Sequence, residues 1–501
     1  MVDVEADVVG ARPDANRSGG PDGAIPLVVD LDGTLCRTDT LHEGLFGLVA
    51  REPRTLLRLA GWLASGRAGF KREVAGRGIL DPALLPYDED VLGFVRAARA
   101  EGRPVVLVSA ADHRQVEAVA AHLGLFDLAV GTGGDPEAPD NLKGQAKAAF
   151  LVRRYGAGGF DYLGDSMADI AVWTMARRAH GVRVPPAVRR AARTRGVELL
   201  ELGLRGGPPL RAMLRACRPH QWAKNLLILV PVLAAQDPSA LLAALLALLC
   251  FSFTASAIYV VNDLADLPSD RLHPRKRRRP FASGELDTVR GLALAAGLLL
   301  ASVLLAALLL PPTFLLVLSG YLALTFAYSF SLKRKMMVDV IVLATLYTLR
   351  IVAGGAATGI VLSPWLLVFS MFLFFALATI KRQAELEDLG SRGGERAAGR
   401  NLVAADLPVL QAMSVGAAQA AVLVFALYAQ DPEVRSHFVS PGLLLLVCPV
   451  LFFWLGRMQL LTRRGHMTDD PIVFTFRDRI SLLCGLLMLA IFALAALGVP
   501  R

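Results

Sequence analysis

The stretch LLAALLALLCFSFTASAIYVVNDLADLPSDRLHPRKRRRP, residues 241–280, joins three kinds of sequence in direct succession. It begins with about 20 apolar residues, enough for a helix to cross the hydrocarbon core of a bilayer. It continues with Asn262, Asp266 and Asp270, spaced to share one helix face, and with Asp263 beside them. It ends in a run of Arg and Lys, which marks the cytoplasmic side of a membrane protein. The stretch therefore predicts a membrane-spanning helix with a carboxylate cluster at its cytoplasmic end.

Nine apolar stretches, this one included, fill the chain after residue 210. They are centred near residues 230, 250, 300, 320, 348, 372, 418, 450 and 489. Nearly all Lys and Arg of this half lie in the loops 262–290, 332–337, 381–406 and 457–479. The opposite loops hold only Arg435, so the basic loops are expected in the cytoplasm. We therefore predict an all-α membrane domain of nine transmembrane helices with its C-terminus outside.

The composition agrees with a chain that is only partly soluble. Of its 501 residues, 54% are hydrophobic and 19% are charged, whereas soluble domains carry about a quarter charged residues. The formal net charge is +9, and the basic loops beside the spans favour anionic lipid or phosphorylated partners, with no nucleic acid. The five cysteines are far apart and form no CxxC pair, so neither a disulfide scaffold nor a structural zinc site is expected.

The first half of the chain has the pattern of an α/β domain. The β-runs IPLVVD, PVVLVS and FDYLGD end at Asp30, Ser109 and Asp165, with helical patterns between them. This alternation predicts an open, mostly parallel, Rossmann-like sheet, in which ligands bind at the carboxyl ends of the strands. We expect a disordered leader without a signal peptide over residues 1–23 and the α/β domain over residues 24–203. A Gly/Pro-rich linker would follow over residues 204–212, and the membrane domain over residues 213–501.

Two carboxylates end the first strand, in DLDGTL at 30–35. One can attack phosphorus as a nucleophile, and the other can donate a proton to the leaving oxygen. Ser109 can hydrogen-bond a phosphate oxygen, and either Lys143 or Lys147 can neutralise developing charge. Asp165 and Asp169, one helical turn apart in GDSMAD, suit magnesium.

In this order and spacing, these motifs resemble the haloacid-dehalogenase-like phosphatases over about residues 24–200. The resemblance implies that Asp30 is the nucleophile and Asp32 the general acid/base. It also implies that Mg2+ is held by the Asp30 side chain, the Asp32 carbonyl and Asp165, and that a helical cap covers about 38–100. The alternative is a Rossmann-like domain with chance acidic turns, or a decayed phosphatase.

The carboxylates at the cytoplasmic end of the span are costly there unless they bind something. A divalent metal that bridges a diphosphate would suit their hard oxygen ligands. Arg271, Lys276 and Arg279 follow directly, where a phosphate would lie.

The string NDxxDxxxDRxHPxKxxRPxAxG resembles the UbiA-type membrane prenyltransferases. RPHQWAKN at 218–225, with Lys224 and Asn225, is similar to the entry to the first helix of that family. The resemblance implies an inward-facing cavity in which Asn262 and the three aspartates hold a magnesium–pyrophosphate group.

The loop after the sixth span departs from the usual second carboxylate motif, because IKRQAELEDL places Lys381 and Arg382 before Glu385. With YSFSLKRK, which holds Tyr328 and Lys333, and with LRIVAGG at 349–355, it resembles the decaprenyl-phosphate phosphoribosyltransferase branch. RGHMTDDPIVFTFRDR at 464–479 is also similar to that branch, without a role assigned to it. Lys and Arg would screen two anionic substrates from one another.

The resemblance therefore implies a Mg2+-dependent enzyme of the bacterial inner membrane, with magnesium in both domains and the N-terminal domain in the cytoplasm. It would transfer 5-phosphoribose from phosphoribosyl pyrophosphate to a polyprenyl phosphate, and the phosphatase domain would remove the 5-phosphate of the lipid product. Alternatives are a prenyltransferase with an aromatic acceptor, and a non-enzymatic lipid-binding membrane protein with a vestigial phosphatase domain. An oligomer is compatible with the sequence.

Overall fold

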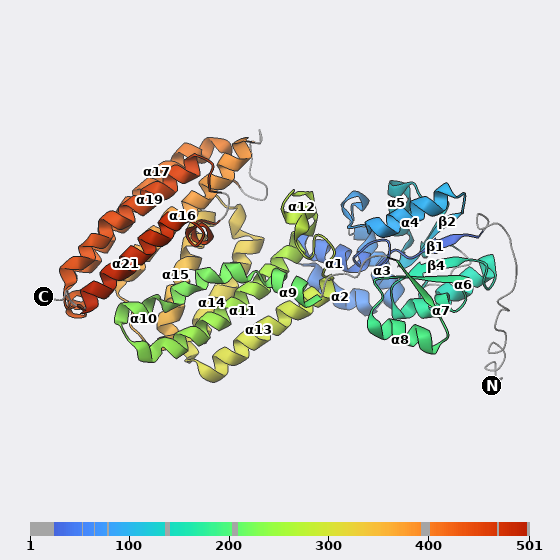
Figure 1. The fold of residues 1–501 in the computed structure, drawn as a ribbon, viewed down its shortest axis with the longest axis horizontal. Coiled ribbons are helices and arrows are strands. Elements are labelled where there is room, and N and C mark those ends of the chain that lie inside the picture. The colour runs from blue at the N-terminus through green and yellow to red at the C-terminus, as the bar shows by residue number, and fades with distance from the viewer. Residues whose placement is uncertain are drawn as a thin grey trace. The chain divides into compact units, whose positions relative to one another are not determined.

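The computed structural model describes residues 25–52, 54–64, 66–77, 80–135, 141–202, 209–391, 401–467 and 470–497 (Figure 1). The chain forms two compact units. The first is the described part of Met1–Ala216 together with Val261–Ala293, and the second is Cys217–Val260 with the described part of Leu294–Arg501. The predicted leader and residues 204–208 of the predicted linker lie outside the described residues.

The first unit contains a six-stranded, all-parallel sheet of order β3-β2-β1-β4-β5-β6. Its strands are β1 Leu27–Val29, β2 Val105–Asp112, β3 Leu128–Thr132, β4 Asp161–Gly164, β5 Arg178–Val182 and β6 Leu199–Leu202. The three strands that the sequence predicts are β1, β2 and β4, and they lie side by side at the centre of the sheet. The predicted α/β fold is therefore confirmed.

Helices cover the sheet and form a separate cap (Figure 1). The helices between strands are α4 Glu89–Ala100, α5 His113–Leu123, α6 Gln145–Tyr155, α7 Ile170–Trp173 and α8 Pro186–Thr194. The cap helices are α1 Thr40–Arg51, α2 Thr55–Ala64 and α3 Gly66–Arg77. The predicted cap boundary near residue 100 is too far along the chain, because α4 buries Val91 and Val95 in the same core cluster as Val29 of β1.

Eight helices of the described chain are long and apolar enough to cross a membrane. They are α11 Leu241–Ala265, α13 Thr288–Leu309, α14 Pro312–Phe330, α15 Val338–Thr358, α16 Pro364–Ser391, α17 Leu407–Gln430, α19 Val447–Arg463 and α21 Arg479–Leu497. The first predicted stretch, near residue 230, is shorter than the others and is interrupted by Pro231, and it forms the 3-10 segment Pro219–Leu229 followed by the short helix α10 Val230–Ala235. Pro231 lacks the backbone N–H that a continuous α-helix would need there.

The long helices carry large apolar side chains on their outer faces. On α13, Leu300 and Leu308 are 60% and 77% exposed, a cost in water but not in lipid. The length of these helices and their apolar outer faces indicate a multi-pass membrane protein.

Candidate active sites

The first site lies where β1, β2 and β4 end. Register pairs Val29 with Leu107 and with Leu163, so Asp30, Ser109 and Asp165 follow neighbouring strands at one edge of the sheet. Asp30 and Ser109 are both buried. The sheet topology thus brings three predicted site residues together.

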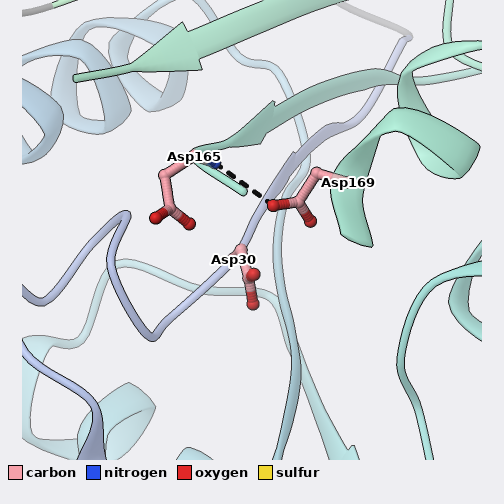
Figure 2. Close-up of side chains that lie close together, drawn as sticks. All are labelled: Asp30, Asp165 and Asp169. Carbon is pink, nitrogen blue, oxygen red and sulfur yellow. Dashed lines mark hydrogen bonds between the residues drawn. The ribbon is translucent and has the colours of Figure 1, made fainter. Parts of the chain in front are cut away.

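Three carboxylates converge at this edge, as Figure 2 shows. Asp30, Asp165 and Asp169 each offer an oxygen within 4.8 Å of the others, the only such group of three or more possible ligands in the described chain. Asp169 also has protein donors: Tyr162 Oη donates to it at 2.7 Å and the Ser166 hydroxyl at 2.7 Å. Asp169 therefore both faces the cluster and caps the turn that holds Asp165.

The turn after β1 approaches the same cluster closely. Gly33 has a φ of 78°, and a Cβ there would collide with the Asp165 carboxylate. Thr34 Oγ1 donates to Asp165 Oδ1 at 3.2 Å, and Arg183 donates to the Gly33 carbonyl at 2.8 Å. Glycine is needed here both for its backbone angle and for space.

The electrostatics of the cluster fit a cation. Burial raises the pKa of Asp30 to about 6, although Lys147 Nζ lies 3.0 Å from its Oδ1, and Asp169 adds to the rise. Burial, then Asp169 and Asp30, also raise the pKa of Asp165. Crowded buried carboxylates resist ionisation unless a positive charge joins them. Carboxylate oxygens are the ligands that Mg2+ prefers, so the three residues suit that ion.

Asp32 has a separate environment. Its Oδ1 accepts a hydrogen bond from the Thr40 backbone N–H at 2.8 Å, at the start of α1. Burial, and then the nearby Asp39, raise its pKa to about 8. The surroundings of Asp32 therefore favour its protonated form, the state that a general acid requires. Its side chain is outside the three-carboxylate group, so its predicted metal contact through the backbone carbonyl stays a prediction.

The structure separates the two candidate lysines. Lys147 on α6 is buried between Asp30 and Asp169, at 3.0 and 4.0 Å. Lys143 is exposed before that helix begins. Lys71 of the cap helix α3 also reaches this edge, where its Nζ donates to the Ala110 carbonyl at 2.6 Å.

The second candidate site holds the aspartate motif after α11. The α-helix is interrupted at Asp266, and the short helix α12 Leu267–Leu272 follows. Asp263 and Asp270 are buried, and Arg279 donates to them at 3.1 and 2.6 Å. Asn262 and Asp266 are half-buried, and the Asp266 carboxylate has no hydrogen bond or ion pair with another side chain of the described chain.

The basic residues of this motif differ from the prediction. Arg279 contacts carboxylates, and Arg271 pairs with Glu43 of α1, whereas both were predicted to face a phosphate. Lys276 is exposed on the 3-10 turn Lys276–Arg278. Because Arg279 lies between Asp263 and Asp270, the three aspartates do not form a metal-ligand group in this structure. The predicted magnesium does not fit here as the side chains stand.

A third cluster lies inside the membrane unit. Lys224 Nζ lies 2.8 Å from Asp470 Oδ2, and Lys381 Nζ lies 2.9 Å from the same oxygen. Tyr347 Oη donates to that carboxylate at 2.9 Å. Burial alone would raise the pKa of Asp470, but the two ammonium groups hold it well below its ordinary value. The predicted residues Lys224 and Lys381, 157 positions apart, are therefore neighbours.

Arg350 extends this cluster. It is 5% exposed, its Nε donates to Asn225 Oδ1 at 2.9 Å, and its guanidinium lies 5.4 Å from the Tyr347 ring centre. Asn225 is held in turn by Ser252 at 3.0 Å. The predicted residue Asn225 thus positions a cation.

Arg382 and Glu385 were predicted to bind substrate, but they belong to a closed ion cluster. Arg382 is fully buried and donates to both oxygens of Asp339, to Tyr328 Oη and to both oxygens of Glu385. These bonds use the guanidinium donors in full, so none points at a ligand. Tyr328 also belongs to this cluster, and Lys333 is half-buried on the 3-10 turn Leu332–Arg334.

Sequence reasoning missed Asp470, Tyr347 and Arg350 as site residues. Asp470 and Arg350 lie in stretches that resemble the phosphoribosyltransferase branch. That resemblance drew attention to the stretches but assigned no role to either residue. A buried carboxylate is recognisable as a counter-charge only when its lysines are seen beside it. The signal was therefore present in the sequence, but the pairing was not.

The sequence matches the UbiA prenyltransferase family over residues 226–480 and the haloacid dehalogenase-like hydrolases over residues 27–173. Uncharacterized protein y4nM of Sinorhizobium fredii is 38% identical over 95% of this chain and 92% of that protein. Nodulation protein NoeC of Azorhizobium caulinodans is 35% identical over 55% of this chain and 90% of NoeC. Decaprenyl-phosphate phosphoribosyltransferase of Mycobacterium tuberculosis is 33% identical over 56% of this chain and 92% of that enzyme.

Solved structures are more distant. A UbiA homolog from Archaeoglobus fulgidus bound to GPP and Mg2+ is 19% identical, covering 56% of this chain and 99% of that chain with a TM-score of 0.44. A substrate-bound phosphoserine phosphatase is 16% identical, covering 33% of this chain and 90% of that chain with a TM-score of 0.25.

Proposed function

The chain belongs to the UbiA prenyltransferase family and carries a haloacid-dehalogenase-like domain at its N-terminus, and from this premise we propose that it transfers 5-phosphoribose from phosphoribosyl pyrophosphate to a polyprenyl phosphate. The basic loops and the N-terminal domain would face the cytoplasm of a bacterial inner membrane. The N-terminal domain would then remove the 5-phosphate from the lipid product.

The observation that carries the proposal is the excess of buried positive charge in the membrane unit. Lys224 and Lys381 pair with a single carboxylate, Asp470, and Arg350 lies nearby against the Tyr347 ring. Lys224 and Arg350 are each more than nine-tenths buried. Unbalanced buried charge is costly, and an anionic substrate would offset that cost. Both proposed substrates are phosphates, and one of them is a lipid. The similarity to the mycobacterial phosphoribosyltransferase supports the same reading.

In the proposed transfer, an oxygen of the lipid phosphate bonds to the anomeric carbon of the ribose. The bond from that carbon to pyrophosphate breaks, and pyrophosphate leaves with the electron pair. Lys224 and Lys381 would screen the two anions from one another as they approach. Asp266, the motif carboxylate with no side-chain partner in the described chain, would face the substrate.

In the proposed hydrolysis, an Asp30 oxygen attacks phosphorus while the phosphate ester bond breaks. Protonated Asp32 gives its proton to the leaving ribose oxygen, then takes a proton from the water that attacks the phosphoaspartate and releases phosphate. Lys147 and Ser109 would hold phosphate oxygens. A divalent cation held by Asp30, Asp165 and Asp169 would neutralise charge on the phosphate and the carboxylates.

One assay tests the transfer. Purified full-length protein would be given labelled phosphoribosyl pyrophosphate, polyprenyl phosphate and Mg2+, and we expect a labelled lipid that is absent when the polyprenyl phosphate is omitted. The same preparation would be offered a prenyl diphosphate with an aromatic acid. A prenylated aromatic product, with no labelled lipid in the first reaction, would instead support the prenyltransferase alternative, and turnover of neither would support a non-enzymatic role.

A further inference from the structure

A buried ion pair joins the cap of the first unit to the aspartate motif. Arg271 Nη1 donates to Glu43 Oε2 at 2.8 Å, and Arg271 Nη2 donates to Oε1 at 2.5 Å. The side chains are 8% and 3% exposed, and they lie 228 residues apart in sequence. Arg271 Nε donates to the Ala282 carbonyl at 3.2 Å. The Arg271 guanidinium thus binds the cap through Glu43 and the loop of its own segment through the Ala282 carbonyl.

The whole motif segment belongs to the same compact unit as the cap. Val261–Ala293 clusters with the α/β domain rather than with the other membrane residues. Gly284 packs so closely that a Cβ there would lie 2.5 Å from Arg37 Cβ and 3.4 Å from Pro86 Cγ. Arg37 and Pro86 flank the cap, so the contact is not confined to one ion pair.

The helix that carries Glu43 also holds the proposed general acid. Thr40, the first residue of α1, gives its backbone N–H to Asp32 at 2.8 Å. Glu43 lies on the same first turn, with its N–H bonded to the Asp39 carbonyl at 3.1 Å. At the other end of the pair, Arg271 directly follows Asp270, which Arg279 binds together with Asp263. One helical turn and one ion pair therefore separate Asp32 from the aspartate motif.

A pair of this kind is poorly explained as a source of stability. Removing two charges from water costs as much as their attraction returns, and an apolar pair of similar size often does equally well. A bidentate Arg–carboxylate pair does fix geometry, because both hydrogen bonds are lost when either group shifts. Because the Glu43–Arg271 pair links residues next to two proposed active sites, its fixed geometry can set the position of both.

We infer that Glu43 is a positioning residue that couples the two active sites. Through Arg271 it holds the aspartate motif of the transferase, and through the first turn of α1 it sets the position of Asp32. The coupling rests on the proposed function, since it presumes that both sites turn over. Its most specific consequence is that a substitution in the transferase motif changes hydrolysis of a small phosphate ester that never enters the membrane.

The experiment uses full-length protein and three substitutions: Arg271→Gln, Glu43→Gln and the two combined. Each is assayed for Mg2+-dependent hydrolysis of p-nitrophenyl phosphate, for transfer from phosphoribosyl pyrophosphate, and for hydrogen exchange of 40–51 and 261–293. Glu285→Gln is the matched control, because it breaks the pair with Arg215 in the same segment, where both side chains are exposed.

We expect Arg271→Gln to lower kcat/KM for p-nitrophenyl phosphate about tenfold, and Glu43→Gln to lower that for transfer similarly. The double variant should lose less than the product of the single losses, because two amides leave no buried charge unpaired. Glu285→Gln should leave both activities unchanged. Unchanged hydrolysis in Arg271→Gln, or multiplicative losses in the double variant, would overturn the coupling.

A further variant and a further measurement cover the cases in which Arg271→Gln does not fold or the wild-type protein is inactive. If Arg271→Gln does not fold, Arg271→Lys keeps the charge but loses the bidentate geometry, and it should still lower hydrolysis. If wild-type protein shows neither activity, the proposed function fails by itself. The coupling is then judged by hydrogen exchange alone: faster exchange of both segments in Glu43→Gln supports it, and unchanged exchange overturns it.

Discussion

At the sheet edge three carboxylates lie together and one lysine pairs with two of them, whereas in the membrane unit two lysines pair with one carboxylate and an arginine lies nearby. At the sheet edge, Lys147 pairs with Asp30 and Asp169, and burial raises the pKa of Asp30 and Asp165. That site lacks positive charge, so it is suited to a metal ion that brings a phosphate with it.

In the membrane unit the balance is reversed. Lys224 and Lys381 share Asp470, whose pKa is held well below its ordinary value, and Arg350 lies nearby against the Tyr347 ring. That site has an excess of positive charge, so it is suited to bind an anion directly. The difference shows that a phosphate site can be prepared either by carboxylates that await a cation or by cations that await the phosphate itself.

The largest expected difference between the two sites comes from a substitution that removes the nucleophile. Asp30→Asn should lower phosphate release at least about 1,000-fold while leaving lipid transfer intact, because the cluster of Lys224, Arg350 and Lys381 lies in the other unit and the substitution spares the Glu43–Arg271 pair. Mass spectrometry of the lipid product should then show one extra phosphate relative to wild type. Asp90→Asn, on an exposed position of α4, is the control. Identical lipid masses from Asp30→Asn and wild type would mean that the phosphatase acts on another substrate.

A second substitution tests the aspartate motif. Asp266→Asn should lower transfer at least about 100-fold without loosening the fold, because its carboxylate has no side-chain partner in the described chain. Asp263→Asn is the matched comparison, and it should also lower the melting temperature by leaving Arg279 with one partner fewer. Near-normal transfer by Asp266→Asn would remove that residue from the site.

A third substitution removes one cation from the membrane cluster. Lys381→Ala should lower kcat/KM for transfer about 10- to 100-fold, because a buried anion loses a counter-charge. Lys381→Arg should recover part of that loss, since it restores the charge without the same geometry. Arg463→Ala is the control, because its pair with Glu387 involves an exposed side chain. Equal rates for Lys381→Ala and wild type would contradict an anion site here.

The smallest expected effect concerns pH and metal at the sheet edge. Asp30 and Asp32 have pKa values of about 6 and about 8 when folded, against 3.8 ordinarily. Between pH 4 and 8 the folded state therefore keeps protons that the unfolded chain has lost, so stability falls as pH rises. Hydrogen-exchange protection of β1 should drop severalfold from pH 5 to pH 8 in a chelator, after correction for intrinsic rates. Mg2+ should restore it at pH 8, and an increase in protection with pH would contradict the charge balance.

The sequence carried much of the fold because its signals are local. β1, β2 and β4 each read as an apolar run that ends in a polar residue, and eight spans read as long apolar stretches. Two errors came from missing context. The cap was drawn through α4, because a helix that packs on a sheet and a helix that packs in a cap have the same periodicity. The apolar stretch near residue 230, which is shorter and is interrupted by Pro231, was counted among nine spans, whereas the structure forms a 3-10 segment and a short helix there.

What the sequence determined by itself is the kind of residue at each site: aspartates after parallel strands, an aspartate motif after a span, and basic residues where relatives have acids. The residue type at each of these positions can be read directly from the sequence. Only the tertiary structure decided which charges meet. It placed Lys147 rather than Lys143 beside Asp30, enclosed Arg382 among carboxylates, turned Arg271 toward Glu43 and set Asp470 between two lysines. The reason is that an ion pair forms between side chains a few ångströms apart in space, and their separation along the chain does not report that distance.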